Sequence, residues 1–93
     1  MTDTIVMYVG LNDRDAHEQL HSVEWFINRI AEYFDCTITP CKGVYRGEVE
    51  NSLRLDIYGL TIEDARMYAR KLCVEFNQAE IVVNGEFISA DAA

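Results

Sequence analysis

Hydrophobic and polar positions follow two different periods along this chain, and each change of period predicts a new element. Residues 4–11 are β-branched or aromatic with almost no polar interruption, which predicts a central strand ended by Gly10 and by turn residues 12–13. Ser22 is a suitable N-cap for the helix that follows. That helix carries one apolar stripe at three- and four-residue spacing, formed by Val23, Phe26, Ile27, Ile30 and Phe34.

From Cys36 the period becomes two. Pro40 indicates an edge strand or a bulge, and residues 46–48, Arg-Gly-Glu, predict a hairpin turn. The return strand directs Leu53, Leu55 and Ile57 inward and Ser52, Arg54, Asp56 and Tyr58 outward.

A capping box at residues 61–64 predicts the start of a second helix. Its apolar stripe consists of Ile62, Ala65, Ala69, Leu72, Cys73 and Phe76. Residues 79–84 then predict a strand, and Asn84-Gly85 predicts a hairpin into a short strand at residues 86–88.

This order predicts an α+β domain of the ferredoxin-like split βαβ type, β-α-β-β-α-β, with two helices on one face of an antiparallel sheet and a short C-terminal hairpin. The length suits one domain, residues 1–93, with residues 89–93 fraying. The other sheet face would carry Arg54, Asp56 and Tyr58. Two alternatives stay open for it: solvation, or cover by a partner, which includes a homodimer formed through this face.

The charge balance points to the class of partner. Sixteen acidic residues against eight basic ones give a net charge of −8, which disfavours direct binding to nucleic acid or to an anionic membrane and favours a basic protein surface. No apolar run approaches the roughly 20 residues of a membrane span, and the N-terminus lacks a signal-peptide pattern. Three cysteines without C-x-x-C spacing suit free thiols in a cytoplasm.

Residues 17–21, His-Glu-Gln-Leu-His, match the H-E-x-x-H pattern of zinc hydrolases, in which two histidines four apart on a helix hold one metal ion. A catalytic zinc site needs a third protein ligand, and the chain has no third histidine. We therefore interpret His17 and His21 as solvated residues before the helix and expect no metal and no cofactor, with zinc hydrolysis as the third function considered. A helix beginning near Asp15 would place both histidines on its first turns.

Other candidate chemistry is weaker. Residues 12–18 do not complete a calcium loop, since the sixth position from Asp13 is Glu18 rather than glycine. The basic residues 66, 70 and 71 allow a phosphate site, although pairing with neighbouring acids is favoured. Ferredoxin-like RNA-binding domains stack bases on sheet aromatics. Three tyrosines lie on predicted strands here, but the acidic charge argues against RNA: Tyr8, Tyr45 and Tyr58.

Residues 8–13, Tyr-Val-Gly-Leu-Asn-Asp, with Val44-Tyr45, residues 51–53 and residues 74–78, resemble a group of small uncharacterised proteins of phages and mobile elements in Firmicutes and related bacteria. The resemblance covers nearly the whole chain and brings no catalytic residues. It implies a context in which small acidic proteins inhibit host machinery, the anti-CRISPR proteins being the best-known class.

The sequence thus predicts a non-enzymatic inhibitor that acts in the cytoplasm of a bacterial host, without catalytic residues. It would block a basic nucleic-acid-binding surface of a host defence protein or nucleoprotein complex. The residues predicted to bind that partner are Asp13, Asp15, Glu18, Glu24 and Glu32. The alternative is a small ligand-binding or regulatory module that dimerises through its sheet.

Overall fold

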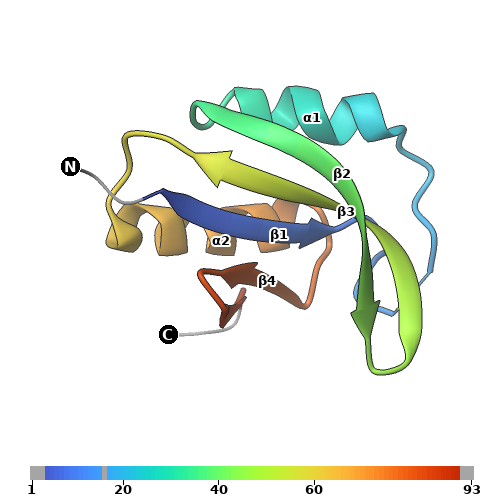
Figure 1. Cartoon of the computed structure of the whole chain (residues 1–93). Coiled ribbons are helices and arrows are strands. Elements are labelled where there is room, and N and C mark those ends of the chain that lie inside the picture. The colour runs from blue at the N-terminus through green and yellow to red at the C-terminus, as the bar shows by residue number, and fades with distance from the viewer. Residues whose placement is uncertain (1–3, 16, 91–93) are drawn as a thin grey trace.

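The computed structural model describes residues 4–15 and 17–90, which form one sheet and two helices (Figure 1). The strands are β1 (Ile5–Gly10), β2 (Cys36–Tyr45), β3 (Glu48–Ile57), β4 (Glu80–Val83) and β5 (Glu86–Ser89), and the helices are α1 (Val23–Ala31) and α2 (Ile62–Glu75). Residues 91–93, most of the tail predicted to fray, lie outside the described part.

The sheet has the strand order β2-β3-β1-β4-β5, and every neighbouring pair is antiparallel. Figure 1 shows both helices behind it, so the predicted α+β domain with two helices on one sheet face is confirmed. The topology departs from a strict β-α-β-β-α-β plan, because the C-terminal hairpin, which the sequence also predicts, adds β5 as a fifth strand beside β4.

The core lies between the sheet and the helices. Alternate residues of the central strands enter it, so Met7 of β1 faces Leu55 on one side and Val83 on the other. The helices complete the core with Phe26 and Ile30 of α1 and with the predicted apolar stripe of α2. Within that stripe, Ile62 is only half-buried. Burying these apolar side chains supplies most of the stability of a domain of this size.

Four details differ from the sequence prediction. The first helix ends at Ala31, and Phe34 is buried in the turn after it. Val23 is exposed, because it stands at the first helical position on the solvent side. Ser52 faces away from the core, as predicted, but it is only 6% exposed, because its side chain lies against Gly43 of the neighbouring strand β2. The helix does not begin near Asp15, since residues 17–22 are irregular.

Both predicted helix caps are present. The Ser22 hydroxyl accepts a hydrogen bond from the Trp25 amide at 3.2 Å, and the Thr61 hydroxyl accepts one from the Asp64 amide at 3.1 Å. These bonds satisfy amides that the first turn of a helix leaves without partners.

A polar cluster joins the two helices at the edge of the core. Glu75 on α2 accepts hydrogen bonds from the Tyr33 hydroxyl and from the guanidinium of Arg29 on α1. Burial raises the pKa of the Glu75 carboxyl, but the bonds from Tyr33 and Arg29 outweigh burial and hold this pKa below its ordinary value of 4.5. The hydrogen bond to Glu75 also raises the pKa of Tyr33.

This cluster predicts a loss of stability in acid. The pKa of Glu75 is lower in the folded chain than in the unfolded one. The contribution of Glu75 to the free energy of unfolding is therefore fully present above about pH 5 and is lost as the pH falls through the pKa of the folded state. We expect the free energy of unfolding to fall less steeply between pH 6 and pH 3 for Glu75→Gln than for the parent chain. Urea titrations at each pH measure this, and parallel curves for the two proteins would contradict it.

The three cysteines are free, as expected. Burial raises the pKa of the Cys73 thiol to about 11, which keeps it protonated and unreactive at neutral pH. Among the residues described, no helix is long and apolar enough to cross a membrane.

Candidate functional site

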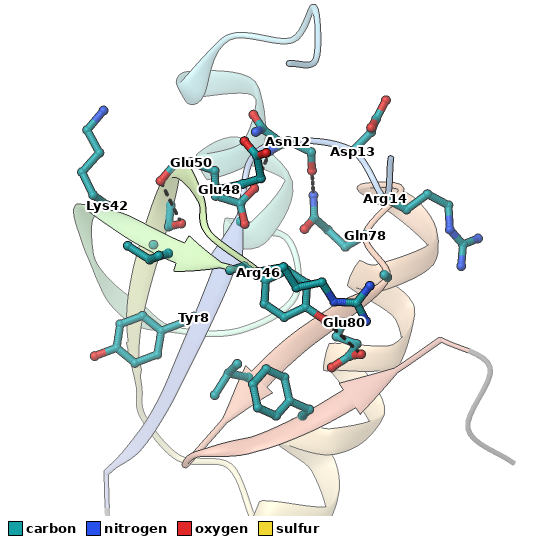
Figure 2. Close-up of a pocket in the computed structure, with 18 of the residues that line it drawn as sticks. Tyr8, Asn12, Asp13, Arg14, Lys42, Arg46, Glu48, Glu50, Gln78 and Glu80 are labelled. Atoms are coloured by element: carbon teal, nitrogen blue, oxygen red, sulfur yellow. Dashed lines mark hydrogen bonds between the residues drawn. The ribbon is translucent and has the colours of Figure 1, made fainter. Parts of the chain in front are cut away.

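A cavity of about 460 Å³ opens on the sheet face that points away from the helices (Figure 2). Its apolar wall contains three aromatic rings from three strands, those of Tyr8, Tyr45 and Phe87, together with Val82. Tyr8 and Val82 alternate along their strands with buried core residues, and Phe87 precedes the buried Ile88, so these three side chains face the other side of the sheet. This volume lies within the range of roughly 300–1,000 Å³ that is typical of small-molecule sites.

The β2–β3 hairpin forms one side of the cavity. The last residue of β1, Gly10, pairs with Ser52, so residues 42–51 extend past the end of β1. At the hairpin tip, the Tyr45 hydroxyl donates to Glu80 Oε1 at 3.3 Å, and the Tyr45 ring lies 6.3 Å from that of Phe87. These contacts reach β4 and β5, which lie beyond β1 in the strand order, so the hairpin arches over the end of the sheet.

The carboxylate of Glu50 on β3 is fixed by contacts on two sides. Its Oε2 accepts a hydrogen bond from the Asn12 amide at 3.2 Å, and its Oε1 would clash with a Cβ added at Gly10. Glycine at position 10 therefore gives this carboxylate the space that it occupies. A smaller polar hollow of about 290 Å³ lies against the same carboxylate and shares Asn12 and Lys42 with the cavity.

Gln78, which follows α2, is only 6% exposed and presents a polar atom to the cavity. Its Nε2 donates to the carbonyl of Asn12. Because a carbonyl oxygen can only accept, this bond determines which end of the amide is nitrogen. Figure 2 shows Oε1 on the opposite side, directed towards the cavity, where it can accept a hydrogen bond from a ligand.

Charged groups of both signs line the cavity. The acidic ones are Asp13, Glu48, Glu50 and Glu80, and the basic ones are Arg14, Lys42 and Arg46. With the aromatic wall, this lining suits a ligand that combines a flat ring, a cationic group and an anionic group. Such a ligand would have its ring stacked and both of its charges matched.

The residues predicted to bind a partner do not all belong to this cavity. Asp13 lines it, and its Oδ1 also accepts hydrogen bonds from the amides of Asp15 and His17, both at 2.9 Å. Glu18 borders only the smaller hollow. The other three lie elsewhere on the surface: Asp15 in the loop, Glu24 in the first turn of α1 and Glu32 paired with Arg29 at 2.7 Å. Their role in binding a partner stays a prediction.

The H-E-x-x-H segment does not form the geometry that this pattern requires. His17 and His21 lie in the irregular segment before α1, so they are not neighbours on one helix face. His21 stacks on the Trp25 ring at 3.7 Å, and His17 Nδ1 lies 3.8 Å from Asp13 Oδ2. In residues 4–15 and 17–90, no three His, Cys, Asp or Glu side chains are grouped so that they could hold a metal ion.

Sequence reasoning missed most of the cavity residues, including Gly10, Arg46, Glu50 and Gln78. Gly10 did carry a signal, because a glycine inside an apolar strand often marks the close approach of another group. We interpreted it as the start of a turn. The strand tyrosines, Tyr8 and Tyr45, did carry a signal as stacking residues, but the acidic charge argues only against stacking on nucleic-acid bases.

No family model and no curated protein matches the chain. A solved structure described as "phage SAM lyase in apo state" is similar to it, with a TM-score of 0.58 and 24% sequence identity. The match covers 97% of this chain and 90% of the other, so the two proteins share a fold over almost their full lengths.

This comparison contradicts one prediction from the sequence. We expected a protein without enzymatic activity, whereas the chain that shares its fold is a lyase. The expectation of a non-enzyme is wrong and is not retained. No recognised sequence motif of a catalytic nucleophile or a metal site includes the residues that line this cavity.

Proposed function

We propose that the protein is an enzyme that binds S-adenosylmethionine (SAM) in this cavity and cleaves it as a lyase. The observation that carries the proposal is the combination of an aromatic wall and a fixed carboxylate, Glu50, in one cavity of suitable volume. The shared fold with a phage SAM lyase supports it.

The chemistry of SAM matches the cavity group by group. Its adenine is flat and stacks on aromatic rings, for which Tyr8, Tyr45 and Phe87 are available. Its sulfonium and its α-ammonium are cationic and are stabilised by carboxylates such as that of Glu50. The carbonyl oxygen of Gln78 is a further acceptor for an amine or a hydroxyl of the ligand.

A lyase breaks a bond without adding water. In SAM a carbon–sulfur bond breaks, and its electron pair remains on sulfur, which becomes a neutral thioether. The carbon regains a full valence within the substrate. Either another group of the substrate bonds to it and closes a ring, or a neighbouring carbon loses a proton to a base and a double bond forms. Because the sulfonium is a good leaving group, the protein has mainly to hold the substrate in a reactive conformation and to exclude water.

A phage or mobile-element origin is part of the same proposal. The Tyr8–Asp13 segment, through its resemblance to proteins of phages and mobile elements, supports it, as does the description of the structural neighbour as a phage protein.

Turnover of SAM tests the proposal directly. We expect the purified protein to consume SAM and to release a neutral adenosyl or methyl thioether, detected by liquid chromatography and mass spectrometry. In water enriched in oxygen-18 neither product should carry the label at early times, because a lyase adds no water. S-adenosylhomocysteine, which lacks the sulfonium, is the matched control and should stay intact.

Absence of SAM consumption at an enzyme concentration equal to that of the substrate would contradict the proposal. Early incorporation of oxygen-18 would instead indicate a hydrolase, which is also a contrary result.

A further inference from the structure

The turn between β2 and β3 contains an arginine in an unfavourable backbone conformation. Arg46 and Gly47 have φ angles of 51° and 80°, so both central positions of this two-residue hairpin turn are left-handed. Such turns favour Asn-Gly, because a residue with a larger side chain is strained there, at a cost of roughly 1–2 kcal/mol. In the described part of the chain, the other non-glycine residues with positive φ are Asn77 and Asn84, which tolerate it well.

The strained residue directs a charged group to the cavity. The Arg46 guanidinium lies 5.3 Å from the centre of the Tyr45 ring, a cation–π contact that orients it beside the cavity that both residues line. Figure 2 shows Arg46 projecting across this end of the cavity near Glu80.

Other arginines of the chain already form ion pairs. Arg29 pairs with Glu75, Arg54 with Asp56 at 3.2 Å and Arg66 with Glu86 at 2.8 Å. Within residues 4–15 and 17–90, the structure gives Arg46 no carboxylate partner within 4 Å. Its guanidinium therefore keeps its five donors available for a ligand.

The cavity needs a cation to accept an anionic group. Four of its lining side chains are acidic, and the whole chain carries a net charge of −8, so a free carboxylate would be repelled without a local positive charge. A guanidinium binds a carboxylate through two parallel hydrogen bonds, which gives orientation as well as energy. Lys42, another basic residue of the lining, already donates to Asn51.

We propose that Arg46 is the specificity-determining residue that binds the α-carboxylate of the amino-acid end of SAM, and that the turn retains arginine for this purpose. This assignment rests on the proposed function. It also defines the orientation of the substrate, with its amino-acid end at the hairpin turn and its adenine on the aromatic wall below.

Arg46→Asn separates recognition from folding, because asparagine is a preferred residue for this turn and removes only the guanidinium. Binding of SAM and of decarboxylated SAM to both proteins is measured by isothermal titration calorimetry, together with SAM turnover. We expect Arg46→Asn to lower the affinity for SAM by roughly 10- to 100-fold. The affinity for decarboxylated SAM should not fall, since that ligand has no carboxylate. The thermal midpoint should not fall, and Arg46→Lys should recover part of the loss.

An equal loss of affinity for SAM and for decarboxylated SAM would indicate a structural role of Arg46 and overturn the assignment. If Arg46→Asn leaves SAM affinity and turnover unchanged, the assignment fails while the proposed function stands. A parent protein that neither binds nor cleaves SAM overturns the proposed function, and the assignment with it.

Discussion

Replacing Glu50 with glutamine is expected to lower kcat/KM for SAM cleavage on the order of 100-fold. Loss of one partner of a partly buried charge pair costs about 3 kcal/mol, which corresponds to this factor. The side chain keeps its size, so the hydrogen bond from the Asn12 amide can re-form on the amide oxygen and the fold should persist. Steady-state kinetics and a thermal melt of the variant measure the two effects.

Glu63→Gln is the matched control. It removes one carboxylate from the exposed first turn of α2, on the helix side of the sheet, and should leave kcat/KM within about twofold of the parent. Gly10→Ala tests the same carboxylate, because the added Cβ would clash with Glu50 Oε1 and displace it. Full activity in both Glu50→Gln and Gly10→Ala would exclude a role for this carboxylate in binding the substrate.

Replacing Phe76 with alanine is expected to lower the free energy of unfolding by about 3–5 kcal/mol. Phe76 is 1% exposed, and its ring lies 4.9 Å from that of Phe26 and 5.7 Å from that of Trp25. The truncation leaves a cavity between α1 and α2. Since domains of this size are stable by roughly 5–15 kcal/mol, the thermal midpoint should fall by about 15–30 °C.

Phe87→Ala is the control for this prediction. Phe87 is 58% exposed on β5, so its truncation should change the free energy of unfolding by less than about 1 kcal/mol. Urea denaturation at one pH compares the two variants. If Phe76→Ala lowers the free energy of unfolding no more than Phe87→Ala does, the packing of Phe76 between the two helices is contradicted.

Local signals in the chain identified the elements of the fold correctly. Ser22 and Thr61 cap their helices, and the turns at residues 46–47 and 84–85 form as predicted. Each of these features depends on a few neighbouring residues, so it can be recognised without knowledge of the rest of the chain. The strand–helix order then restricts the topology to a few arrangements.

The candidate site could not be recognised in this way, because its parts are far apart in sequence. The Asn12 amide donates a hydrogen bond to the carboxylate of Glu50, and the Asn12 carbonyl accepts one from Gln78. Tyr45 meets Glu80 and Phe87 only because the hairpin arches over the end of the sheet. No spacing rule connects such residues. The one local motif, at residues 17–21, pointed elsewhere because its segment is not helical.

By itself the sequence determined the elements, their order, the two-layer α+β architecture and the acidic surface, since all of these follow from local periodicity, turn chemistry and composition. Only the tertiary structure decided that Ser52 is covered, that Gly10 makes room for Glu50, and that the strained Arg46 lies beside an aromatic cavity. The physical reason is that a pocket is formed by side chains from strands paired over long sequence separations. Its shape therefore depends on the register and bending of the sheet rather than on any short stretch of residues.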